Sequence, residues 1–193
     1  MSDHTNQDPA TEAHWLTWLD WAGAQGIAVP ADPAFTQARA RVWEASEYVA
    51  ITAARHPADF AELIASGDLE SVYGAGDLAQ RLETALAGVA DEPSLQRALR
   101  IFRRREMLRI IWRDIAERAP LPETLEDLSE LADVCIDAAL ARLHDWTCAE
   151  LGTPRDADGQ AQRLLVLAMG KLGARELNLS SDIDLIFAFA PTG

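Results

Sequence analysis

The sequence predicts a mainly α-helical chain that ends in the start of an α/β unit. Apolar side chains recur at steps of three and four through most of residues 31–152, which is the spacing of one helix face. Short links between the longer helices favour antiparallel neighbours, and therefore a helical bundle. Beyond a turn-rich stretch at 152–159, two apolar runs at 164–169 and 183–189 are typical of strands. We therefore expect a helical leader followed by an incomplete sheet.

Each helix of the leader has its own signals. An apolar stripe from Phe35 to Thr52 predicts one helix that ends at His56, and Pro57 suits the first turn of the next. Asp77 is placed to cap a helix running to about residue 90. A further helix is expected over about 93–118. The last helix carries a stripe through 125–146, with Thr124 and Asp127 spaced like a capping box.

These elements predict three regions. Residues 1–30 are expected to hold a flexible tail, over residues 1–8, and a first helix; 31–152 form the helical region; and 160–193 form the first part of a second domain that stops before its sheet is complete. No apolar run approaches the roughly 20 residues that span a bilayer, and the polar N-terminus is not a secretory signal. We therefore expect a cytoplasmic protein that binds no membrane.

The charge balance excludes a general nucleic-acid-binding protein. Seventeen basic residues stand against 31 acidic ones, a net charge of −14, whereas polyanions require clustered basic surface. Eight arginines nevertheless fall between Arg97 and Arg118, in one expected helix. Some could contact phosphates or a protein substrate. For most of them we favour a solvated face that pairs with carboxylates, such as Glu106 with Arg103 or Arg109.

The residues that carry chemistry lie close to the end of the sequence. Asp182 and Asp184 are two apart in the second expected strand, so both carboxylates would lie on one face. Two adjacent carboxylates repel each other, and a divalent cation relieves that repulsion. Mg²⁺ is favoured because it accepts one or two carboxylates together with phosphate oxygens. Asp182 and Asp184 are therefore the predicted metal ligands and catalytic residues.

A phosphate-binding segment is predicted just before them. Gly170 and Gly173 would let the backbone approach a phosphate group, at the start of a short helix expected over 174–178. Lys171, the only lysine of the chain, offers a point charge. The hydroxyls of Ser180 and Ser181 could donate hydrogen bonds to the same phosphates.

The ordered set of these features resembles the opening of the polymerase-beta-like nucleotidyltransferase superfamily. More closely, residues 169–187, which read MGKLGARELNLSSDIDLIF, resemble the signature of the bacterial glutamine synthetase adenylyltransferase family. The arginine-rich run at 102–114 and the Leu-x-x-Leu-Ser-x-Leu-Ala-Asp pattern within 125–140 are similar to the same family.

That resemblance implies an incomplete nucleotidyltransferase sheet and a bifunctional, Mg²⁺-dependent enzyme with ATP and ADP as substrate or product. In the family, a C-terminal domain transfers AMP to a tyrosine of glutamine synthetase, and an N-terminal domain removes it by phosphorolysis. Because a helical leader precedes the motif, this chain resembles the N-terminal, adenylyl-removing part. Glutamine synthetase is the implied protein substrate, the PII signalling protein is a second candidate partner, and the implied role is nitrogen regulation.

Two alternatives stay open at this point. The chain could be a non-catalytic helical interaction module left by truncation, or a related nucleotidyltransferase such as a PII uridylyltransferase. The resemblance also implies a third metal-binding carboxylate, which has no counterpart before Gly193. We therefore expect residues 1–193 alone to be inactive.

Overall fold

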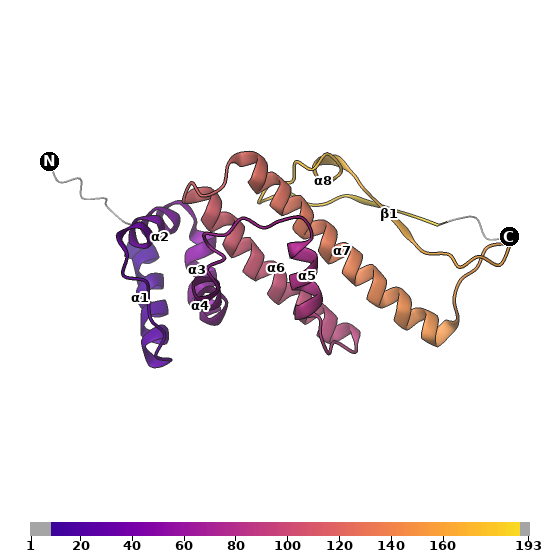
Figure 1. Cartoon of the computed structure of the whole chain (residues 1–193), viewed down its shortest axis with the longest axis horizontal. Coiled ribbons are helices and arrows are strands. Elements are labelled where there is room, and N and C mark those ends of the chain that lie inside the picture. The colour runs from indigo at the N-terminus through magenta and orange to yellow at the C-terminus, as the bar shows by residue number, and fades with distance from the viewer. Residues whose placement is uncertain (1–8, 190–193) are drawn as a thin grey trace. The chain divides into compact units, whose positions relative to one another are not determined.

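The structure, a computed structural model, describes residues 9–189, so the predicted tail at residues 1–8 lies outside the described residues. Within the described part, the helices and strands are, in order, α1 (Pro9–Ala24), α2 (Pro33–Ala45), α3 (Glu47–Arg55), α4 (Pro57–Ser66), α5 (Asp77–Ala85), α6 (Glu92–Ile115), α7 (Leu121–Leu151), β1 (Leu165–Ala168), α8 (Gly170–Gly173) and β2 (Leu185–Ala188). This order confirms a mainly α-helical chain that ends in the start of an α/β unit (Figure 1). No strand interrupts residues 92–146, and no described helix has the length and apolar character needed to cross a bilayer.

The chain divides into two compact units, each built from two stretches of sequence. The first comprises the residues up to Val72 together with Arg104–Thr124, and the second comprises Tyr73–Arg103 together with the residues from Leu125 onward. One boundary between the units therefore falls inside α6. The predicted regions, with boundaries near residues 30 and 152, stay a prediction.

Two helix boundaries differ from the sequence prediction. The single helix expected from Phe35 to His56 is two helices, because Ser46 adopts an extended conformation and its Oγ caps α3 by accepting a hydrogen bond from the Val49 N–H (3.3 Å). The capping box at Thr124 is wrong, because α7 begins at Leu121 and tolerates Pro122 in its first turn. The Thr124 hydroxyl instead bonds the Asp114 carboxylate across 2.9 Å.

The prediction for the helix at Asp77 is wrong in two respects. Gly76, rather than Asp77, is the N-cap residue of α5, and the helix ends at Ala85 rather than near residue 90. The Asp77 carboxylate instead accepts a hydrogen bond from the Gly74 N–H (2.8 Å), which closes the turn that leads into α5.

Aromatic side chains form the core of the first unit, in which α1–α4 lie side by side (Figure 1). Trp15 stacks on Trp18 with ring centroids 5.0 Å apart, and the edge of Phe60 meets Trp18 at 5.3 Å. The Trp18 indole N–H donates to the Pro57 carbonyl (3.1 Å), so the ring is both buried and hydrogen-bonded. Trp15 and Trp18 therefore belong to the packed core of the first unit.

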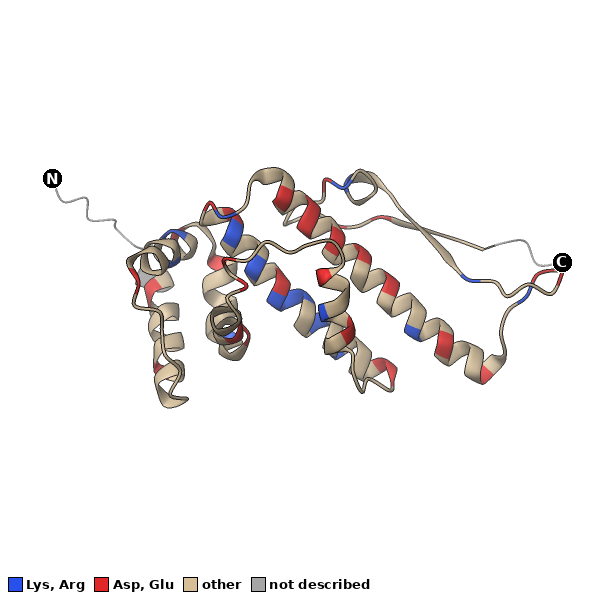
Figure 2. Cartoon of the chain, in the orientation of Figure 1, with Lys and Arg blue, Asp and Glu red and all other residues tan. Residues whose placement is uncertain are grey.

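Four arginines of α6 that belong to the first unit pair with carboxylates. The guanidinium of Arg105 contacts Glu62, Asp68 and Glu106, each across 2.5 Å. Arg109 and Glu106, 2.9 Å apart, are fully buried. The pairing of Arg109 with Glu106 is thus confirmed, whereas the expected solvated face is wrong for this segment. Figure 2 shows the basic residues along α6 and the acidic residues along α7.

We predict that Glu106→Gln lowers the free energy of unfolding by about 3 kcal/mol, because it removes one charge from the fully buried pair of Glu106 and Arg109. Glu62→Gln is the matched control, since the Glu62 side chain is half exposed and its pair with Arg105 is worth less than about 1 kcal/mol. Urea denaturation followed by tryptophan fluorescence measures both. Equal losses in the two variants would contradict the account of this buried network.

Candidate functional site

The two strands of the second unit bring the predicted site residues to one end of a small sheet. β1 and β2 are antiparallel, with Leu165 opposite Ala188 and Ala168 opposite Leu185. The Met169 N–H donates to the Asp184 carbonyl (2.9 Å), which extends the pairing by one step. Because the end of β1 lies beside the start of β2, the segment from Gly170 and the carboxylates before Leu185 meet at this end. The adjacent strands are thus confirmed.

Both carboxylates lie just before β2 rather than inside it. Asp182 and Asp184 belong to an irregular segment, and both are exposed. The strand expected to begin at Asp182 is therefore wrong by three residues, because the pairing begins only at Leu185. Among residues 9–189, no three His, Cys, Asp or Glu side chains gather closely enough to hold one metal ion.

The glycine segment forms one helical turn, α8, directly after β1. Gly170 has φ 55°, a conformation that favours glycine. A Cβ on Gly173 would lie 2.5 Å from the Ala168 carbonyl oxygen, so only glycine fits where the turn passes the end of β1. The helix expected over 174–178 is wrong, since the helical turn is Gly170–Gly173 itself.

A chain of hydrogen bonds ties this turn to the carboxylate segment. The Lys171 ammonium donates to the Ser181 hydroxyl (3.0 Å), which in turn bonds the side-chain oxygen of Asn178 (2.5 Å). Lys171 therefore lies beside the residue that precedes Asp182. Ser180 is exposed in the turn just before Ser181.

The α8 turn ends in a Schellman motif with an arginine at the left-handed position. The Arg175 N–H donates to the Leu172 carbonyl (3.0 Å), and the Glu176 N–H donates to the Lys171 carbonyl (2.7 Å). Arg175 has φ 57°, where glycine is the usual residue of this motif.

The side chain of Arg175 joins this turn to α7. It contacts the Glu126 carboxylate through Nε (2.8 Å) and Nη2, and it reaches Asp133 through Nη1 (2.8 Å). Beside it, the fully buried Ser129 hydroxyl accepts a hydrogen bond from the Leu177 N–H (3.3 Å). Residues 126, 129 and 133 lie on one face of α7 by their helical spacing.

The pKa values of two acidic residues of α7, Glu126 and Glu130, are shifted in opposite directions. The hydrogen bond from Arg175 lowers the pKa of Glu126, and it also raises the pKa of the guanidinium. Burial raises the pKa of Glu130, and the neighbouring charge of Asp127 raises it further. One carboxylate is therefore stabilised in its charged form, while its neighbour four residues along is not.

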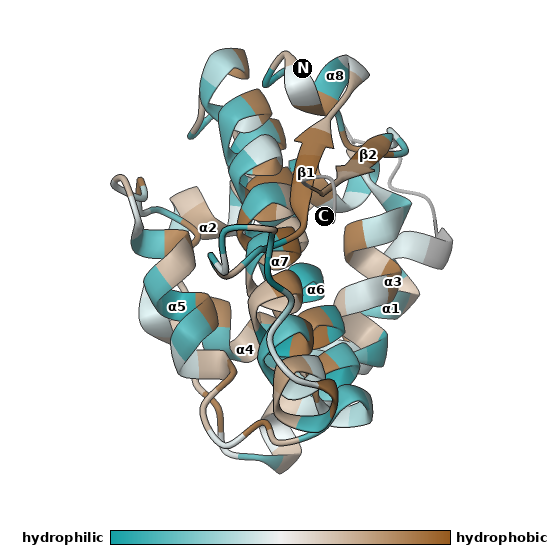
Figure 3. Cartoon of the chain, turned by 90° about the vertical axis from the view of Figure 1, so that its right-hand side faces the viewer, coloured by the Kyte–Doolittle hydropathy of each residue, from teal (hydrophilic) through white to brown (hydrophobic). Residues whose placement is uncertain are grey.

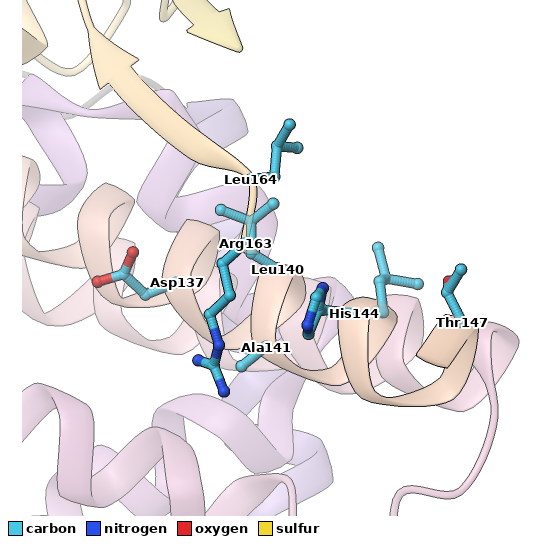
Figure 4. Close-up of a pocket in the computed structure, with 8 residues that line it drawn as sticks. Asp137, Leu140, Ala141, His144, Thr147, Arg163 and Leu164 are labelled. Atoms are coloured by element: carbon cyan, nitrogen blue, oxygen red, sulfur yellow. The ribbon is translucent and has the colours of Figure 1, made fainter. Parts of the chain in front are cut away.

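The structure also contains an open groove of about 550 Å³ further along α7. Figure 4 shows that Asp137, Leu140 and His144 line it together with Arg163 and Leu164. None of the predicted site residues lines this groove, so the groove and the candidate site share no residue.

The structure thus brings together Gly170, Lys171 and Gly173 with Ser181 and the carboxylate segment. Sequence reasoning missed the residues that hold this assembly on α7. Their only signal was the spacing of Glu126, Ser129 and Asp133, which is typical of one helix face.

We predict that Glu126→Gln and Glu130→Gln change thermal stability in opposite directions at neutral pH. The lowered pKa of Glu126 means that its charge stabilises the fold above the ordinary glutamate pKa, so Glu126→Gln lowers Tm, by a small amount because the side chain is half exposed and solvent screens its charge. The raised pKa of Glu130 means that its contribution is present at low pH and lost as pH rises, so Glu130→Gln raises Tm. Melting curves recorded from about pH 4 to about pH 8 test both signs. Shifts of the same sign at pH 7 would contradict the assignment.

Comparison with known proteins finds the same family that the motif at residues 169–187 resembles. A model of the glutamate–ammonia ligase adenylyltransferase family matches residues 36–193. The chain is 49% identical over 157 residues to the bifunctional glutamine synthetase adenylyltransferase/adenylyl-removing enzyme of Thioalkalivibrio sulfidiphilus, a match that covers 81% of this chain and 16% of the relative. The enzymes of the same name from Pseudomonas aeruginosa and Pseudomonas syringae are 52% identical over 154 residues and 42% identical over 184 residues.

These matches cover 79% and 93% of this chain, and 16% and 18% of the two Pseudomonas relatives. The chain thus spans less than a fifth of the length of the curated relatives it matches, whereas the family model matches most of the chain itself. The chain therefore belongs to the glutamate–ammonia ligase adenylyltransferase family.

Proposed function

We propose that this chain is part of an enzyme that removes AMP from a tyrosine of glutamine synthetase, and that the whole protein also adds it, as a means of nitrogen regulation. The observation that carries the proposal is the meeting of the α8 turn with the Asp182–Asp184 segment at one end of the sheet. The names of the relatives, which include both adenylyl transfer and adenylyl removal, support the same reaction.

The donor chemistry of the carboxylate segment suits Mg²⁺. Asp182 and Asp184 offer two exposed carboxylates, and Mg²⁺ needs only one or two from the protein when phosphate oxygens and water complete its shell. Asp182 and Asp184 would hold the ion in this proposal. When bound, the ion would neutralise the charge that develops on phosphate oxygens.

The phosphate groups are assigned to the neighbouring turn. Gly170 and Gly173 leave the two ends of the turn without side chains. Lys171 and Ser181, which already share a hydrogen bond, would act as one pair of donors, and Ser180 would add a second hydroxyl. The turn, and the ion held by the carboxylates, would thus contact the same phosphates.

The proposed reaction is a phosphorolysis. An oxygen of inorganic phosphate forms a bond to the phosphorus of the adenylyl group, and the bond from that phosphorus to the tyrosyl oxygen breaks. The tyrosyl oxygen takes up a proton, and the products are ADP and unmodified tyrosine. Addition of AMP by the whole protein would be a separate reaction, in which the tyrosyl oxygen displaces pyrophosphate from ATP. The protein's part is to position the reactants and to stabilise charge at phosphorus.

Glutamine synthetase is the proposed partner, and the PII signalling protein is a candidate regulator of the whole protein. We place the protein in the cytoplasm, where its proposed partner acts, and propose no contact with nucleic acid or membrane. The competing proposal is a helical interaction module without catalysis, and the experiment below separates the two.

We predict that Asp184→Asn abolishes adenylyl removal. The assay uses a hybrid in which this chain replaces the segment that it matches in the Pseudomonas aeruginosa relative, and it follows ADP release from adenylylated glutamine synthetase with phosphate and Mg²⁺. Loss of a metal ligand should reduce the rate about 1000-fold or more. Asp158→Asn is the matched control, because Asp158 is exposed in a turn outside the site.

Retained ADP release in the Asp184→Asn hybrid would contradict the proposal and favour the interaction module. Residues 1–193 assayed alone are expected to release no ADP, because their described part offers two carboxylates at the site and no third one nearby.

A further inference from the structure

Arg175 occupies a position where an arginine is unfavourable for the backbone. It is the left-handed residue of the Schellman motif that ends α8, and a side chain at φ 57° strains the chain where glycine would not. A non-glycine residue in such a conformation persists when its side chain makes contacts that glycine cannot make. The contacts of the Arg175 side chain are therefore expected to hold the backbone in this conformation.

Those contacts are poorly suited to stabilising the fold as a whole. The side chains of Arg175, Glu126 and Asp133 are each 39–51% exposed, and ion pairs at that exposure contribute little to stability because water and salt screen them. Their geometry, however, is specific. One planar guanidinium reaches two carboxylates separated by two turns of α7, which fixes its orientation in a way that a single pair would not.

The clamp acts on the segment that carries the proposed phosphate contacts. Arg175 and Leu177 attach the end of the α8 turn to α7, the latter through Ser129. The buried side chains of Leu172 and Leu177 anchor the same stretch. At the other end, the turn is joined to β1 and to Ser181. The polar contacts with α7 thus act together with the two buried leucines to position Gly170–Gly173.

We propose that Arg175 is a positioning residue, which with Glu126 and Asp133 fixes the α8 turn on α7 in the geometry that binds inorganic phosphate. The proposal rests on the proposed function for its substrate, but its structural part stands independently. Arg175 itself need not touch the phosphate. Its loss would spread the backbone amides of the turn over several geometries, and phosphate binding would weaken.

The first test uses the 193-residue chain and the variant Arg175→Gly. Glycine suits the left-handed position. If Arg175 served only to end the turn, Arg175→Gly would therefore leave the backbone amides of the turn as well protected from exchange as before. If the guanidinium positions the turn, the amides of residues 172–177 exchange with deuterium about tenfold faster, while those of α1–α4 are unchanged. Arg142→Gln, which breaks another arginine pair of α7 with Glu83, is the control and should leave the turn within about twofold.

The second test measures phosphorolysis in the hybrid enzyme. Weaker binding of phosphate in both the ground state and the transition state raises KM and leaves kcat nearly unchanged, so Arg175→Gly should raise the KM for inorganic phosphate about tenfold. The Arg142→Gln hybrid should keep its KM. A loss of kcat without a change in KM would overturn the positioning role.

The outcomes separate this inference from the function on which it rests. Unchanged exchange in Arg175→Gly, or unchanged KM in a hybrid that loses activity with Asp184→Asn, would overturn the role of Arg175 and leave the proposed function intact. A hybrid that stays active with Asp184→Asn would overturn the proposed function, and the exchange experiment would still decide whether Arg175 fixes the turn.

Discussion

Pairing between arginine and carboxylate is the constraint on which both units depend. The chain has 31 acidic and 17 basic side chains, so each arginine can contact several carboxylates. In the first unit, Arg105 and Arg109 surround the buried Glu106, and neither charge is tolerable without the other. In the second unit, the partly exposed Arg175 pairs with two carboxylates, those of Glu126 and Asp133. The buried network stabilises a core, whereas the exposed one sets the position of a turn.

The candidate site follows from a short antiparallel pair rather than from a finished sheet. β1 leads into the glycine turn and β2 begins beside it, so the two segments to which we assign phosphate and metal binding meet without any further element. The strands are apolar, as Figure 3 shows, and Leu165, Leu167 and Ile186 are each about half exposed. By the alternation along paired strands, these three side chains share one face of the sheet.

The sequence predicted the features that depend on local spacing. Helices over 33–151 follow from apolar periodicity, and the strands at 165–168 and 185–188 follow from short apolar runs between turn residues. The prediction of a single helix failed at Ser46, because a serine that caps a helix can also lie within a continuous apolar stripe. Sequence reasoning failed again at Asp182, because the alternating pattern begins three residues before the first paired residue, Leu185. The contact of Arg175 with Glu126 joins residues 49 positions apart, and no pattern within a single sequence encodes such a pair.

In the proposed function, a divalent cation binds at Asp182 and Asp184, beside the α8 turn. The direct measurement adds Mn²⁺, as a paramagnetic stand-in for Mg²⁺, to the ¹⁵N-labelled 193-residue chain and records which amide signals broaden first. The account predicts early broadening at residues 182–185 and 170–173, and its loss in Asp184→Asn. Broadening that begins instead at the acidic turn around Asp156 and Asp158, or that survives Asp184→Asn, would contradict it.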